Sequence, residues 1–229
     1  MQVSLAGAIR NHPSHPRPLT EIYDDFLHYA SLAEDLGFNR VWLSEHHMAE
    51  DDWNPSPITV LAAIAARTRT IRLGTFVLLL PLHHPLKIAE EIATLDVLSH
   101  GRFDFAVGAG PMDVECTAFG INRAEAYART YESLAVIEKL LTEATVTHHG
   151  KYYHLDNVSM TTRPVQKPTP PIYTTPLFGP QSWDKSAQRG YNVASALHTP
   201  MWLQYPEMLA KYGRKRENVR IVRTALTAQ

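Results

Sequence analysis

Two adjacent histidines follow a short apolar run near the start of this sequence and are its clearest candidates for chemistry. The run begins at Val41, and Glu45, His46 and His47 come directly after it. An imidazole exchanges a proton near neutral pH, so it can act as a general base or hold a polar group by a hydrogen bond. Consecutive side chains of an extended segment point to opposite sides, so one histidine can face a ligand while the other packs or hydrogen-bonds elsewhere. A purely structural pair that fixes this loop is the alternative.

The chain contains 12 histidines, which raises the question of a metal. Zinc enzymes use convergent ligands, as in His-x-His on a strand or His-Glu-x-x-His on a helix, and the sequence contains neither pattern. The other two pairs, His83-His84 and His148-His149, also place neighbours on opposite sides. We therefore expect no metal site.

Two glycine-containing turns are candidates for ligand contact. Gly108, Ala109 and Gly110 form a turn whose backbone could approach a flat or anionic ligand, although a plain tight turn explains them equally well. They do not form a Gly-x-Gly-x-x-Gly motif, so a Rossmann dinucleotide site is not expected. Gly179 and Ser182 open a predicted helix, where free amides and a hydroxyl favour an anion. A simple helix cap at Ser182 is the alternative.

The elements that position these residues alternate between strands and helices. This alternation predicts an α/β fold with a parallel sheet, whose functional groups gather in the loops after the strands. An inserted hairpin is expected near residues 144–155. Strands are predicted at residues 3–9, 40–44, 71–80, 102–108, 171–175, 192–196 and 219–226, and helices at 20–37, 57–67, 85–99 and 122–143.

Composition narrows the class of protein. With 229 residues, 45% of them apolar, the chain can bury a real core and is most simply one domain over residues 1–229. A formal net charge of -1 argues against nucleic acid as a partner. No apolar segment is long enough for a membrane span, and no signal peptide is recognisable. One cysteine, Cys116, suits a reducing compartment, so we expect a cytoplasmic protein without membrane contact.

Five blocks of the sequence resemble the bacterial luciferase-like monooxygenase family, and they occur in the family's order. They read AEDLGFNRVWLSEHH, SPITVLAAIAARTRTIRLGT, LPLHHPLKIAEEIATLDVLSHGRFDFAVGAG, ECTAFG and PVQKPTPPIY. The resemblance implies a TIM (β/α)8-type barrel that binds a reduced flavin at the C-terminal ends of its strands.

The resemblance also implies roles for single residues. The first histidine of the EHH block is the catalytic one in the family, which assigns catalysis to His46. Luciferase carries a phosphate-binding arginine where this chain has Ala109, which leaves open whether FMN or a deazaflavin binds. Residues matching family cofactor contacts are Phe76 and Val77 beneath the ring system, the turn Gly108, Ala109 and Gly110, the phosphate site with Gly179 and Ser182, and His198 beside the ring.

The function expected from these residues is a flavin-dependent monooxygenase. It would use reduced FMN, supplied by a separate flavin reductase, and dioxygen to oxidise a small apolar substrate. Hydride transfer with the deazaflavin F420 is one alternative, and a non-catalytic flavin-binding protein is another. Because only seven strands are predicted, we further expect either a barrel truncated after strand seven or an edge covered in a homodimer.

Overall fold

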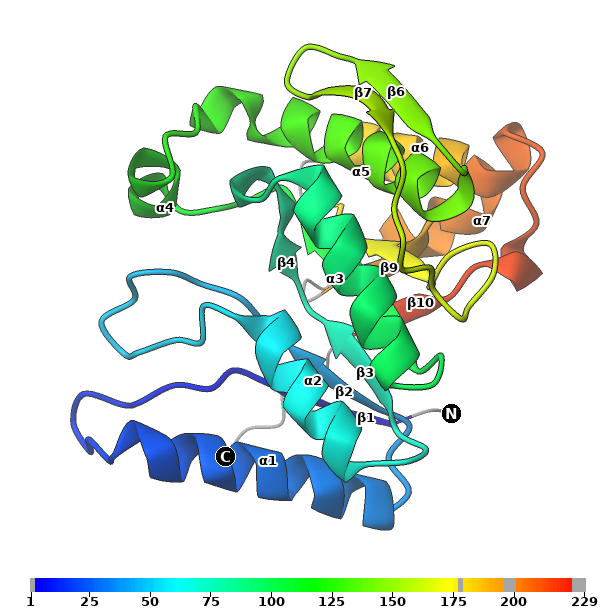
Figure 1. Cartoon of the computed structure of the whole chain (residues 1–229). Helices are drawn as coiled ribbons and strands as arrows, with labels where there is room; N and C mark the ends of the chain where they lie inside the picture. The colour runs from blue at the N-terminus through cyan, green and yellow to red at the C-terminus, as the bar shows by residue number, and fades with distance from the viewer. Residues whose placement is uncertain (1–2, 177–178, 196–200, 224–229) are drawn as a thin grey trace.

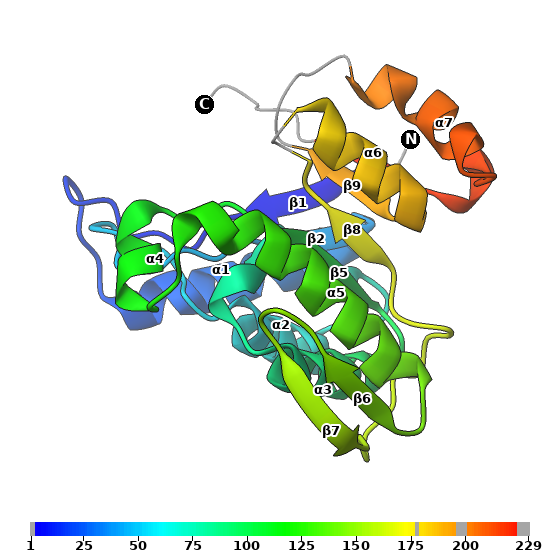
Figure 2. The same cartoon turned by 90° about the horizontal axis from the view of Figure 1, so that it is seen from above.

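The computed structural model describes residues 3–176, 179–195 and 201–223. In this part of the chain, parallel strands form one curled sheet in the order β1-β2-β3-β5-β8-β9-β10, with the short β4 beside β5 (Figure 1 and Figure 2). The strands are β1 Ser4–Gly7, β2 Arg40–Leu43, β3 Arg72–Thr75, β4 Leu78–Leu79, β5 Phe103–Gly108, β8 Ile172–Thr174, β9 Asn192–Ser195 and β10 Ile221–Arg223. Spatial order follows sequence order, as strand-helix repeats require.

Helices connect the strands and cover the sheet. Seen from above, α5 runs beside α3, while α6 and α7 lie next to each other over the later strands (Figure 2). The α-helices are α1 Leu19–Asp35, α2 Pro57–Arg67, α3 Pro85–Leu98, α4 Asp113–Ala118, α5 Ala126–Thr142, α6 Pro180–Arg189 and α7 Met201–Lys211. The described residues also include short 3₁₀ helices at η1 Leu80–Leu82, η2 Arg123–Glu125 and η3 Arg216–Asn218. None of the helices in the described ranges has the length and apolar character to cross a bilayer.

The inserted hairpin is present as a separate two-stranded antiparallel sheet. It consists of β6 Val146–His149 and β7 His154–Val158, and it follows α5 directly. The predicted insertion near residues 144–155 is therefore confirmed, and the hairpin extends three residues further.

The inner strands of the sheet are buried, whereas the edge strand β1 is half-buried with one residue exposed. Every residue of β2 and β5 is buried. Trp42, Tyr173 and Ala194 belong to a buried cluster on the concave side, where Phe76 and Val77 pack against them. Gly74 makes this packing possible, because a Cβ there would lie 2.2 Å from the Trp42 ring.

Three local predictions differ from the structure. The predicted strand 71–80 is interrupted at Phe76 and Val77, whose connecting peptide is cis, so β3 and β4 are separate. Helix α1 covers Leu19–Asp35, so it begins one residue before the predicted start and ends two residues before the predicted end. The last predicted strand is shorter within the described residues, where β10 covers Ile221–Arg223.

Candidate active site

Within the described residues, those predicted to do chemistry lie at or after the C-terminal ends of β2, β3, β5 and β8. In parallel α/β sheets this edge carries the functional groups, because the strand-to-helix loops all emerge there. We call it the C-terminal edge of the sheet. The opposite edge contains a buried ion-pair group, in which Arg40 and Arg72 both contact the fully buried Asp104. Such a group at the N-terminal edge contributes to stability rather than to catalysis.

His46 is held by a buried carboxylate that sequence reasoning did not assign. The Nδ1 atom of His46 lies 3.0 Å from Oε1 of Glu115, whose side chain is completely buried. An ionised carboxylate can only accept hydrogen bonds, so it favours the tautomer with the proton on Nδ1. The Nε2 atom then carries the free lone pair, which is the form in which an imidazole acts as a base.

Helix α4 brings Glu115 to His46. The carboxylate also accepts hydrogen bonds from the amide of His47 at 2.8 Å and from the amide of Met112 at 2.5 Å. It therefore joins the start of α4 to the loop after β2. The ECTAFG block begins with Glu115. An acidic residue in the first turn of a helix, after a glycine turn, is the feature of the sequence that could have identified Glu115 as a site residue.

Glu45 is the centre of a second buried group. Its Oε1 atom accepts hydrogen bonds from Nε2 of His47 at 2.9 Å and Nε2 of His83 at 2.7 Å, and its Oε2 atom accepts one from the Leu79 amide. Burial alone would raise the pKa of the Glu45 carboxyl, but these three hydrogen bonds outweigh burial and lower it. The adjacent His46 and His47 thus meet different carboxylates, as expected for consecutive residues.

Trp53 lies against His46 and shields one side of it. The two rings meet edge to face with centroids 4.5 Å apart. The indole Nε1 donates to Oγ of Ser44 at 2.8 Å, and the guanidinium of Arg10 stacks over the indole at 4.4 Å. Ser44 and Arg10 therefore hold the Trp53 indole in place, and this indole limits access of water to the His46 imidazole.

Phe76 and Val77 are both half-buried at the C-terminal edge. The Phe76 ring lies 5.9 Å from the Trp42 ring. Gly108 has a packing reason to be glycine, since a Cβ there would lie 2.6 Å from Cγ2 of Val77. Beyond it, Ala109 is half-buried and Gly110 is exposed, so the turn is accessible but carries no charged side chain.

The predicted anion site is at the start of α6. Gly179 has a φ of 76°, and the space around its missing Cβ is open to 4 Å. Ser182 is 1% exposed, and its hydroxyl donates to the Gly179 carbonyl at 2.8 Å. The Ser182 hydroxyl would have to turn away from the Gly179 carbonyl before it could donate a hydrogen bond to a phosphate. The remaining predicted contact, His198, lies outside the described residues.

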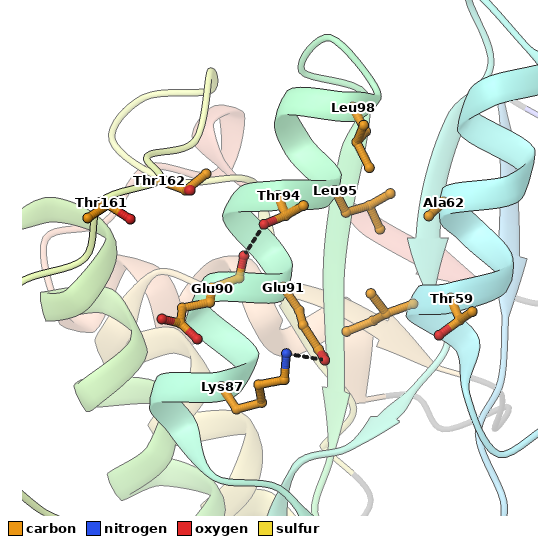
Figure 3. A pocket seen from close by; sticks show the side chains of 11 residues that line it. Thr59, Ala62, Lys87, Glu90, Glu91, Thr94, Leu95, Leu98, Thr161 and Thr162 are labelled. Atoms are coloured by element: carbon orange, nitrogen blue, oxygen red, sulfur yellow. Dashed lines mark hydrogen bonds and ion pairs between the residues drawn. The ribbon is translucent and has the colours of Figure 1, made fainter.

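A surface cavity of about 510 Å³ lies away from these residues, between α2, α3 and the segment after β7 (Figure 3). Lys87 and Glu91 form an ion pair along α3, and Leu95 and Leu98 continue its lining. None of the predicted site residues lines this cavity, so it is not the candidate active site.

Comparison with known proteins identifies one family over almost the whole chain. The family described as luciferase-like monooxygenase matches residues 1–228. The oxygenase component of a flavin-dependent trigonelline monooxygenase from Acinetobacter baylyi is 30% identical over 76% of this chain and 48% of that protein. An F420-dependent glucose-6-phosphate dehydrogenase from Microbacterium testaceum is 31% identical over 86% of this chain and 61% of that protein.

A solved structure agrees with this assignment. The monooxygenase RslO1 from Streptomyces bottropensis matches with a TM-score of 0.88 and 31% identity, over 96% of this chain and 70% of that one. The chain spans about half the length of the first curated relatives it matches. By sequence and by fold, this chain belongs to the luciferase-like monooxygenase family.

Proposed function

We propose that this chain forms the cofactor-binding part of a flavin-dependent monooxygenase that uses reduced FMN and dioxygen on a small apolar substrate. The observation that carries the proposal is the pair of His46 and the buried Glu115 at the C-terminal edge of the sheet, 3.0 Å apart. A buried carboxylate that orients an imidazole is a common arrangement for a catalytic base. The proposed whole protein is a TIM-type barrel, of which these strands are the larger part.

The residues at this edge suit a flavin ring. Phe76 and Val77 offer a half-buried, uncharged surface for a flat ring system, and His46 offers one nitrogen for its polar edge. We propose that the start of α6 near Gly179 binds the phosphate, as helix N-termini commonly do. A reduced flavin supplies the electrons with which dioxygen is activated.

In the proposed mechanism, His46 accepts or holds a proton at Nε2. Glu115 keeps the proton on Nδ1 and stabilises the imidazolium that forms when Nε2 is protonated. Trp53 excludes water from one side of the imidazole, which strengthens these hydrogen bonds.

Hydride transfer with F420 is the second candidate function. Ala109 leaves the glycine turn without a cation for the FMN phosphate, and the Microbacterium relative is named for F420. In hydride transfer with F420, His46 and Glu115 would hold a proton beside the substrate. For the FMN reading we also propose a separate flavin reductase as partner, because the Acinetobacter relative is named an oxygenase component. A homodimer and a cytoplasmic location stay predictions.

The test begins with the cofactor that binds the purified chain. We expect reduced FMN to bind and to support oxygen uptake that rises when an aldehyde, a ketone or an alkane is added. Reduction of F420 by an alcohol, without oxygen uptake, would replace this function by hydride transfer. Flavin binding without turnover on any substrate would favour the non-catalytic alternative, and binding of neither cofactor would refute the proposal.

A further inference from the structure

The Glu45 group has the composition and the spacing of a metal site. Glu45, His47 and His83 each offer one ligand atom, and no two of these atoms are more than 4.8 Å apart. Two imidazole nitrogens and one carboxylate oxygen are a known ligand set for Zn²⁺, with water in the fourth position. We propose that these three residues bind one Zn²⁺ ion per chain, whether or not the proposed flavin chemistry is right.

Local sequence patterns do not indicate the Glu45 group, because its members follow the ends of two different strands. Glu45 and His47 are two residues apart in the extended segment after β2, so their side chains point to the same side. His83 comes from the turn after η1, and it reaches the same carboxylate. Adjacent histidines and the His-x-His and His-Glu-x-x-His motifs do not reveal a Glu-x-His pair that meets a distant histidine.

Two of the three distances between ligand atoms are close to those of a four-coordinate site. Bonds of about 2.0–2.1 Å place tetrahedral zinc ligands about 3.3 Å from each other. The two contacts from Glu45 Oε1 to the imidazole nitrogens measure 2.9 Å and 2.7 Å, so each would lengthen by about 0.5 Å. Small side-chain rotations achieve this, with the Nδ1-protonated tautomer presenting each Nε2 lone pair.

The surroundings orient the ligands and leave room for the fourth position. The Leu79 amide holds Oε2 of Glu45 and leaves Oε1 for the ion, as hydrogen bonds to metal-binding carboxylates commonly do. A cavity of about 150 Å³ is lined by Glu45 and His83 and can hold water. Lys87 also lines it, but this ammonium is paired with Glu91 at 3.2 Å. Its charge is therefore compensated.

Equilibrium dialysis of the cofactor-free chain against zinc chloride tests the proposal. The variants are His83→Gln, whose amide can still donate to Glu45 but is a poor zinc ligand, and His84→Ala as a matched control. His84 is the exposed neighbour; it accepts a hydrogen bond from the Leu86 amide and lines the same cavity, but it contributes no atom to the ligand set. We expect about one zinc per chain, about hundredfold weaker binding in His83→Gln, and binding within about threefold of wild type in His84→Ala.

Two further measurements distinguish zinc binding by the Glu45 group from a purely hydrogen-bonding role. Co²⁺ on the wild-type chain should give the visible absorption of a tetrahedral site, which requires no variant. Zinc should raise the melting temperature of the wild type but not of folded His83→Gln. The absence of stoichiometric zinc and of this cobalt spectrum would refute the site. Equal losses in both variants would also refute it.

Discussion

Replacing Glu115 with glutamine tests whether this residue positions His46. In the wild type, two N–H groups, from His46 and His47, meet Oε1, and a third, from Met112, meets Oε2. A glutamine that keeps its oxygen at the Oε1 position makes two charge-assisted hydrogen bonds neutral, at a cost of about 1 kcal/mol each. Its NH2 group then faces the Met112 amide, and this unsatisfied donor costs about 1–3 kcal/mol more.

The expected result is a fall of about 3–5 kcal/mol in the free energy of unfolding, measured by urea denaturation. Turnover should fall by about a hundredfold, because the imidazole loses its orienting charge. Nitrogen-15 NMR of labelled histidines, with the His46 signals assigned by mutation, reports the tautomer directly. The wild type should carry the proton on Nδ1, and Glu115→Gln should be a mixture of both tautomers.

The control is Asp113→Asn on the same helix. The Asp113 side chain is 85% exposed and pairs with Arg123 at the surface, so its loss should cost less than about 1 kcal/mol. If Glu115→Gln were no less stable than Asp113→Asn and kept the wild-type His46 tautomer, Glu115 would not position His46.

Three further predictions use other parts of the chain. His46→Ala should keep the fold and lower turnover by about a hundredfold or more, while His47→Ala should lower stability more than turnover. Steady-state kinetics measures the turnover, and circular dichroism measures the fold. Equal losses of activity in the two variants would contradict the prediction. Ser182→Ala should weaken FMN binding by about 1 kcal/mol more than riboflavin binding, and equal weakening in calorimetry would leave Ser182 only a role at the helix start. Glu34 is partly desolvated, which would raise its pKa, but hydrogen bonds from the amides of Ile71, Thr70 and Arg69 lower this pKa from 4.5 to about 2. Glu34 therefore stabilises the folded state above pH 4.5, and this contribution is lost as pH falls toward 2. After allowance for solvent screening, Glu34→Gln should cost about 1–2 kcal/mol at pH 7 and nearly nothing near pH 2, and a cost independent of pH in urea titrations would contradict the assignment.

Local patterns predicted much of the fold. The alternation of apolar runs with helical stretches predicted the α/β class and the parallel sheet. The helix predicted at 20–37 corresponds to α1, which Gly37 follows with a left-handed φ of 78°. The interruption at Phe76 and Val77 was not predictable, because the apolar run continues through it. The sequence also could not show that Gly108 is required by the approach of Val77, since that contact is tertiary.

The candidate site was predicted only in part, because its partners are distant in sequence. His46 was identified from its place after an apolar run and from the family resemblance. Its partner Glu115 is 69 residues away, and nothing local relates the two. For the same reason the sequence showed Glu45 only as a neighbour of the histidines, although it accepts a hydrogen bond from His83, 38 residues away.

The hydrogen bond between His46 and Glu115 also has a consequence for synthesis on the ribosome. The first strands and helices can begin to fold as they emerge, but the imidazole acquires its orienting carboxylate only after residue 115 has left the exit tunnel. Bringing residues 69 apart in sequence into contact costs loop-closure entropy before the contact itself stabilises the chain. The nascent chain should therefore gain binding competence late, and a cofactor present during translation would meet a chain that holds only half of the pair.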